Sequence, residues 1–69
     1  MRIKNLQDIV KNKQAEKIDG VLVDTFTAHC ILLCWKAGNE NTKERIATGD
    51  IISVGKLAVA VCTRKASKL

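Results

Sequence analysis

Residues 26–35 carry an apolar side chain at almost every position, and no other segment limits the possible folds as strongly. Asp24 and the threonines beside it are good helix N-caps, and Gly38 is a natural C′ residue, so we predict a helix over residues 25–37. A surface helix needs only one apolar stripe, whereas a helix that is apolar nearly all round is central or meets another subunit. A chain of 69 residues can hardly surround such a helix by itself, so we expect a symmetric homo-oligomer.

The composition strengthens this expectation, because a chain of this size normally needs a disulfide, a metal or a partner subunit to be stable. A single domain over residues 1–69 buries only about 60% of its unfolded surface. Aromatic residues make up 3% of the sequence, so the core must be aliphatic. The cysteines number three, an odd count that indicates reduced thiols rather than a disulfide framework. Subunit association is therefore the stabilising feature that we expect.

The first third of the chain predicts a helix followed by a β-hairpin. Four apolar side chains share one helical face over residues 3–12: Ile3, Leu6, Ile9 and Val10. Asp19-Gly20 is typical of a type I′ turn, and its flanks predict strands at 15–18 and 21–23. A two-stranded hairpin is marginal in water, so we expect it to pack on helices or pair with another chain.

The last third contains one clear helix and one ambiguous segment. Asn41 and Glu44 resemble a capping box, which predicts a short helix over residues 41–48. Residues 51–62 are rich in β-branched residues and fit a buried strand, but their spacing also fits a buried helix. Asp50 as a cap and the basic residues near the end favour the helix. The predicted fold class is therefore α+β and helix-rich: a helix, a β-hairpin, then three helices.

The net charge is +5, and the cations gather toward the two ends of the sequence. Residues 1–17 hold five cations against two acids, and residues 56–69 hold four cations and no acid. This distribution predicts an anionic partner, either a nucleotide, a nucleic acid or an acidic protein. No apolar run follows the first four residues, and the run 28–35 is too short to span a bilayer. We therefore expect a cytoplasmic protein with no membrane partner.

One segment resembles a known group of proteins. The sequence GVLVD at residues 20–24, followed by Thr27-Ala28, resembles a family of small bacteriophage proteins with a GVLVD-x-x-TA segment, a helix and an Asn-rich turn. The resemblance implies a phage origin, a helix-rich fold and a helix over residues 51–65. It also implies the cytoplasm of the infected bacterial host as location. The family has no settled activity, and its usual Tyr-Asp is replaced here by Trp35-Lys36.

The sequence contains no pattern that predicts an enzyme. Cys30 and Cys34 lie on one helical face, but zinc usually requires four ligands and a CxxC knuckle, so no metal is expected. His29 cannot activate Cys30, because adjacent residues on a helix do not face each other. Five of the seven acidic residues stand at turn or cap positions, namely Asp19, Asp24, Glu40, Glu44 and Asp50. No phosphate-binding or metalloprotease motif is present. We expect no cofactor and no catalysis.

Six residues are candidates for ligand binding. An indole can stack on a base, hydroxyls at a helix start can help to hold a phosphate, and a basic edge can attract an anion. Oligomer symmetry would repeat that basic edge and create a pocket between subunits that one small chain cannot enclose. The candidates are Thr25, Thr27, Trp35, Lys56, Arg64 and Lys65.

These observations lead to a ranked set of function hypotheses. The first is a phage counter-defence protein that binds and sequesters a small anionic, nucleotide-type immune signalling molecule without turnover. The second is a nucleic-acid-binding phage accessory protein, which predicts steeply salt-dependent binding. The third is a protein–protein inhibitor of a host factor, which predicts a host partner and no small ligand.

Overall fold

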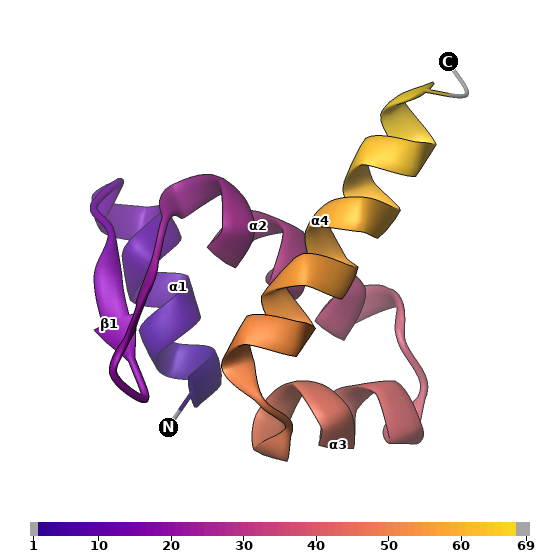
Figure 1. The fold of residues 1–69 in the computed structure, drawn as a ribbon, viewed down its shortest axis with the longest axis horizontal. Helices are drawn as coiled ribbons and strands as arrows, with labels where there is room; N and C mark the ends of the chain where they lie inside the picture. Colours follow the sequence, from indigo (N-terminus) through magenta and orange to yellow (C-terminus); the bar gives the residue numbers. More distant parts are fainter. Residues whose placement is uncertain (1, 68–69) are drawn as a thin grey trace.

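The structure is a computed structural model that describes the backbone of residues 2–67 and the side chains of residues 2–64. The order of elements confirms the predicted helix, hairpin and three helices (Figure 1). The elements are α1 (Arg2–Asn12), β1 (Glu16–Ile18), β2 (Val21–Val23), α2 (Thr25–Ala37), α3 (Glu40–Thr48) and α4 (Ile51–Ser67). The ambiguous segment is thus a helix, and α4 is the longest element of the described chain.

The hairpin has the turn that its sequence predicts. Asp19 and Gly20 have φ angles of 51° and 78°, which are the positive values that a type I′ turn requires. The strands pair antiparallel, with Glu16 opposite Val23 and Ile18 opposite Val21. Because side chains alternate between the two faces of a strand, Ile18, Val21 and Val23 turn toward the core. The paired residues Lys17 and Leu22 lie on the other face and are exposed.

The first helix ends in a way that the sequence did not indicate. Lys13 has a φ of 52°, and its N–H donates to the carbonyl of Val10 while the N–H of Gln14 donates to that of Ile9. These two bonds are the Schellman arrangement, which usually places glycine at the left-handed position. A lysine adopts that conformation here at a steric cost, and it turns the chain from α1 toward the hairpin.

The second helix begins and ends at the predicted residues, but its C-terminal glycine is not left-handed. Asp24 is extended and its carboxylate accepts from the backbone N–H of Thr27 at 2.6 Å, as expected of an N-cap. Gly38 has φ −83° and ψ 159°, which corrects the prediction of a C′ glycine. The physical reason for glycine there is space, because a Cβ would lie 2.5 Å from Cγ2 of Thr42 and 2.8 Å from the carbonyl oxygen of Cys34.

The caps of the last two helices correct one prediction and confirm another. Helix α3 begins one residue earlier than predicted and is capped by Asn39, whose side chain accepts from the N–H of Thr42 at 3.0 Å. The predicted capping box at Asn41 was wrong because Asn39 has the extended backbone that an N-cap needs. Asp50 caps α4 by accepting from the N–H and the hydroxyl of Ser53.

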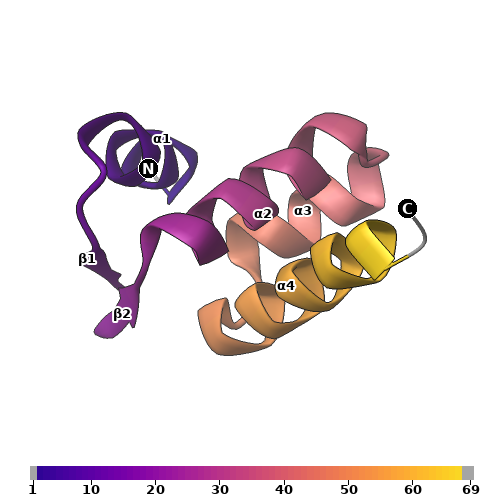
Figure 2. The same ribbon diagram turned by 90° about the horizontal axis from the view of Figure 1, so that it is seen from above.

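Helix α2 lies at the centre of the fold. It contacts α1 on one side and packs beside α3 and α4 on the other (Figure 2). Every element contributes to one aliphatic core, whose members are Leu6, Ile9, Ile18, Val23, Ala28, Cys30, Ile31, Ile46, Ile51, Val54 and Ala58. Gly55 is also buried and faces Thr27, so the small residues of α4 let the two helices approach closely.

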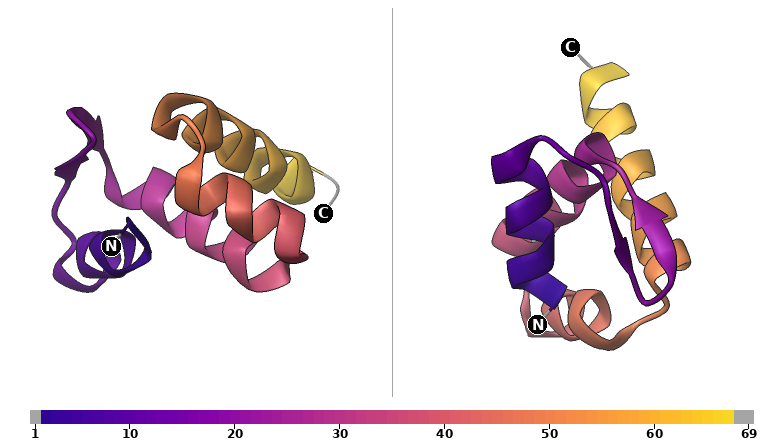
Figure 3. Two further views of the ribbon diagram at one scale, coloured as in Figure 1. Left: turned by 90° about the horizontal axis from the view of Figure 1, so that it is seen from below. Right: turned by 90° about the vertical axis from the view of Figure 1, so that its left-hand side faces the viewer.

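One side chain joins three parts of the chain that are far apart in sequence. The Arg2 guanidinium donates to the carbonyls of Ile46 and Gly49, at 2.8 and 2.7 Å, and forms an ion pair with Asp19. The start of α1 therefore lies against the C-terminal end of α3 (Figure 3). A cation is favourable there because the last carbonyls of a helix carry partial negative charge and have no partner within the helix.

Candidate functional site

The exposed surface is larger than a chain of this mass usually has, and it carries several large apolar side chains. Folded monomers of 7.6 kDa expose about 4,300 Å² by the usual scaling of surface with mass, and this chain exposes 5070 Å². Six large apolar side chains are exposed among those described: Leu22, Phe26, Leu33, Ile52, Leu57 and Val61.

An apolar groove lies between the hairpin and α4, and we call it the hairpin groove. It measures about 450 Å³ and is open to solvent along one side. Its lining comes from β2, the first turn of α2 and one side of α4: Val21, Leu22, Val23, Thr27, Ile51, Ile52, Gly55, Lys56, Val59 and Ala60. Lys56 is the single charged residue among them.

A second apolar groove, which we call the α3 groove, lies on the opposite side of α4. It consists of two adjoining hollows of about 480 and 270 Å³ that share Cys34, Thr42 and Val61. Leu33 of α2 and Leu57 of α4 also line it, and both are exposed. Helix α4 therefore separates two apolar grooves, which explains why half of the exposed large apolar side chains belong to it.

The structure brings two of the predicted ligand-binding residues together and separates the others. Thr27 and Lys56 both line the hairpin groove. Thr25 is half-buried in the first turn of α2, and Arg64 is exposed on the last described turns of α4. The side chain of Lys65 lies outside the described residues. Trp35 lies elsewhere, so these residues form no common pocket within one chain.

The start of α2 already holds a negative charge. The Asp24 carboxylate accepts hydrogen bonds from the side chain and the backbone of Thr27, and these bonds lower the pKa of that carboxyl. It therefore stays ionised at neutral pH and occupies the position that a phosphate would take. A second anion would be repelled, so Thr25 and Thr27 are better explained by capping than by phosphate binding.

Replacing Asp24 by alanine should lower the free energy of unfolding by about 1 kcal/mol at pH 7, because the N–H of Thr27 loses its acceptor. Urea denaturation of the variant and the wild type measures the difference. Since folding lowers the pKa of Asp24 below 3.8, the contribution is present above that pH and is lost as the pH falls through the folded pKa. Asp24→Asn keeps the acceptor and is the matched control. Equal stability of Asp24→Ala and wild type at pH 7 would contradict the capping role.

Trp35 occupies a separate hollow between α1 and α2. It shares a space of about 300 Å³ with Val10, His29, Leu32 and other residues of the two helices. The ammonium of Lys43 lies 5.7 Å from the centre of a Trp35 ring, a cation–π distance. The half-buried indole thus bridges α2 and α3 and packs against the core. Trp35 does not line the hairpin groove that contains Lys56, so the indole could not stack on a base bound in that groove.

The three cysteines are reduced and lie near one another where α2 meets α4. Cys30 is fully buried, and Cys34 and Cys62 are half-buried. Burial, followed by a hydrogen bond with Cys62, raises the pKa of the Cys30 thiol from 9.0 to about 12. Cys30 is therefore a packing residue rather than a nucleophile. Among the described residues, no three His, Cys, Asp or Glu side chains gather in a way that could hold a metal.

Cys30 should resist alkylation by iodoacetamide at pH 8 in the native protein, because a thiol with a pKa of about 12 is about one part in ten thousand thiolate. Peptide mass mapping measures the modification, and the same reaction in urea is the control. Folding favours the thiol form, so Cys30 contributes stability that is complete below pH 9 and declines as the pH rises toward 12. Rapid native labelling at Cys30 would show that α2 and α4 separate easily.

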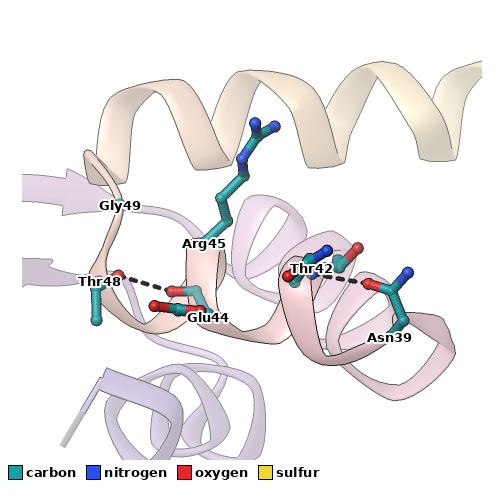
Figure 4. Close-up of a pocket in the computed structure, with 7 residues that line it drawn as sticks. Asn39, Thr42, Glu44, Arg45, Thr48 and Gly49 are labelled. Atoms are coloured by element: carbon teal, nitrogen blue, oxygen red, sulfur yellow. Dashed lines mark hydrogen bonds between the residues drawn. The ribbon is translucent and has the colours of Figure 1, made fainter.

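A polar hollow lies along α3, and no feature of the sequence predicted it. It measures about 560 Å³ and is lined by Asn39, Asn41, Thr42, Glu44, Arg45, Thr48 and Gly49. Asn39 and Thr48 are engaged in bonds that stabilise the ends of α3, and Arg45 extends toward α4 (Figure 4). These bonds explain the polar residues by helix capping, and the hollow lacks the apolar walls of a typical ligand pocket.

Comparison of the chain with protein-family models, with curated protein sequences and with solved structures found no significant match. Among the described residues, no helix combines the length and the apolar character that crossing a membrane requires.

Proposed function

We propose that this chain is a non-catalytic binding protein that acts as a homo-oligomer and sequesters a nucleotide-type signalling molecule between its subunits. The observation that carries the proposal is the pair of open apolar grooves on the two sides of α4, together with Lys56 in the hairpin groove. The groove is large enough for part of a small ligand, but its open side leaves most of a ligand in water. A second subunit would close it.

The chemistry of the grooves supports binding without turnover. The fully buried thiol of Cys30 has a raised pKa. The exposed acids Asp24, Glu40 and Asp50 stand at the starts of helices. Lys56 lies in the hairpin groove without an ion pair among the described residues, so its charge is available to an anion. A site with one cation, apolar walls and no acid–base pair holds a ligand and leaves it unchanged.

The role in phage counter-defence rests on the resemblance of the segment GVLVD and Thr27-Ala28 to small bacteriophage proteins. The structure gives that segment a clear structural use, since it supplies β2, the Asp24 cap and the first turn of α2. A small protein that removes a host signal by binding it stoichiometrically needs no catalytic group. The proposed location is the cytoplasm of the infected bacterial host, where such a signal would be found.

The placement of the cations favours a small ligand over nucleic acid. Nucleic-acid binders collect lysines and arginines on one face, along the path of the phosphate backbone. Here the described cations are spread over α1, β1, α2, α3 and α4, and Arg2 is engaged within the fold. An apolar groove with a single cation suits a compact anion that also has an apolar or aromatic part.

A thermal-shift panel with cyclic di- and trinucleotides, cyclic ADP-ribose forms and short DNA tests the proposal. A ligand that binds only the folded state stabilises it by about 2.7 kcal/mol at a hundredfold excess over Kd. We expect a shift with one nucleotide class and unchanged ligand on recovery, and we expect Lys56→Ala to weaken the shift. Lys11→Ala removes an exposed cation that does not line the groove and is the matched control. The absence of any nucleotide-dependent shift would refute sequestration.

A further inference from the structure

We propose that Cys30 and Cys62 form a reversible disulfide that joins α2 to α4, with a low-molecular-weight disulfide such as glutathione disulfide as the oxidant. This inference goes beyond the proposed function and does not depend on it. Its starting point is that the cysteines of the chain gather where α2 meets α4, although the binding proposed above uses none of them.

The cysteines lie on the sides of the two helices that face each other. Val54 and Ala58 are buried on one side of α4, and Cys62 continues the same stripe one turn further along. On α2, Cys30 is fully buried and Cys34 follows one turn later on the same face. Cys34 and Cys62 line the same hollow of the α3 groove. Cys62 therefore packs against the face of α2 that carries the other two thiols.

The hydrogen bond between the thiols of Cys30 and Cys62 identifies the pair that can join. A disulfide requires Cα atoms within about 7 Å of each other, so the two helices must approach closely. They do so at Gly55, where an added Cβ would lie 3.2 Å from Cγ2 of Thr27. From this contact α2 and α4 continue side by side toward the thiols (Figure 2). The fold thus presents the two sulfurs to each other before any oxidation.

The oxidant can reach Cys62 through the α3 groove. Cys62 is half-buried and lines the hollow of about 480 Å³ at the surface, whereas Cys30 is fully buried. Lys36 lines the same hollow and Arg45 lines the adjoining one, and no acidic residue is among the lining residues of either. Glutathione disulfide carries a net negative charge at neutral pH, so these cations favour its approach.

The chemistry consists of two thiol–disulfide exchanges. The Cys62 thiol loses its proton to solvent, and the thiolate attacks one sulfur of glutathione disulfide. The S–S bond of the oxidant breaks, and the first glutathione leaves as a thiolate that takes up a proton. The Cys30 sulfur then attacks the Cys62 sulfur of this mixed disulfide, and its proton goes to the second departing glutathione. Two protein thiols are oxidised, and one glutathione disulfide is reduced to two glutathione thiols.

The second exchange is slow because Cys30 is buried. A thiol whose pKa is raised to about 12 is rarely a thiolate at neutral pH. The attack on Cys62 is intramolecular, however, and its effective concentration exceeds that of any dissolved reagent. We therefore expect the disulfide to close over minutes to hours, while Cys30 remains protected from iodoacetamide.

The disulfide would change the stability of the chain. It closes a loop that contains α3, and such a loop restricts the unfolded chain more than the folded one. The equilibrium constant for unfolding should fall on the order of a hundredfold. Because glutathione thiols reverse both exchanges, the stability of the protein would follow the redox state of its surroundings.

Oxidation of the full chain in glutathione buffers, followed by mass spectrometry, tests the pairing. The wild type should lose two hydrogen atoms and yield two tryptic peptides joined by a disulfide. No lysine or arginine separates Cys30 from Cys34, so both lie on one of these peptides, and Cys34→Ser is the matched control that should still form the link. Cys30→Ala removes the second attacking thiol and should stop at a glutathione adduct on Cys62. Circular dichroism checks that each variant is folded.

A wild type that stays reduced, or that keeps its glutathione adduct without closing the disulfide, overturns the inference. A link that is lost in Cys34→Ser, or that forms in Cys30→Ala, overturns it as well, because Cys34 would then be the partner of Cys62. Urea denaturation of the wild type gives a readout that needs no variant. The oxidised protein should have the higher midpoint, dithiothreitol should restore the lower one, and equal midpoints contradict the proposed staple between α2 and α4.

Discussion

Replacing Ile31 by alanine is expected to lower the free energy of unfolding by about 3 kcal/mol. Ile31 is fully buried in α2, the helix that contacts α1, α3 and α4, so the cavity would open at the meeting point of the helices. A chain of 69 residues has a total stability of about 3–10 kcal/mol, and a loss of this size leaves a substantial unfolded population. Circular dichroism during urea denaturation measures the effect.

Leu22→Ala is the matched control, because it removes a comparable aliphatic side chain from a position that is 66% exposed. Its cost should stay below about 1 kcal/mol, as is usual for surface substitutions. If both variants lose the same free energy, α2 is not the centre of the core and the arrangement of helices described above is wrong.

Replacing Arg2 by alanine is expected to lower the free energy of unfolding by about 2 kcal/mol, an unusually large effect for the second residue of a chain. The substitution leaves the carbonyls of Ile46 and Gly49 without their donor and frees the start of α1 from α3. The Arg2 side chain is only 13% exposed, so water replaces these bonds poorly. Chemical denaturation measures the loss, and hydrogen exchange should show faster opening at the end of α3.

Asp19→Asn separates the ion pair from the carbonyl bonds. Asparagine tolerates the positive φ of that turn position, so the hairpin is kept while the charge is removed. The Asp19 side chain is exposed, and exposed ion pairs contribute little, so this variant should lose less than about 1 kcal/mol. If Asp19→Asn costs as much as Arg2→Ala, the carbonyl contacts of Arg2 do not matter.

Some short sequence signals predicted the local structure correctly, whereas the capping box expected at Asn41 and the C′ glycine expected at Gly38 were wrong. The bounds of α2 follow from the Asp24 cap and the end of the apolar run, and the hairpin follows from Asp19-Gly20. The end of α1 was not predictable in the same way, since Lys13 adopts a conformation that normally indicates glycine. Periodicity alone did not distinguish strand from helix over residues 51–62, but the Asp50 cap and the nearby cations favoured the helix that the structure has.

Contacts between residues that are far apart in the chain could not be predicted from the sequence. Nothing local indicates that Arg2 bonds to residues 44 and 47 positions away, because such contacts depend on how the helices pack. The same limit affected the candidate site. Thr27 and Lys56 do share a groove, but Trp35 packs between α1 and α2, on a different part of the molecule. Which faces of α2 and α4 stay exposed was decided by tertiary packing.

The central claim is that the exposed apolar surface around α4 is covered by another copy of the chain. Equilibrium sedimentation of the wild-type protein over a range of concentrations tests this claim most directly. We predict a molar mass that rises with concentration to a multiple of 7.6 kDa, and that Leu57→Asp stays at 7.6 kDa while keeping its helical circular dichroism spectrum. A wild-type protein that remains at 7.6 kDa throughout would contradict the account.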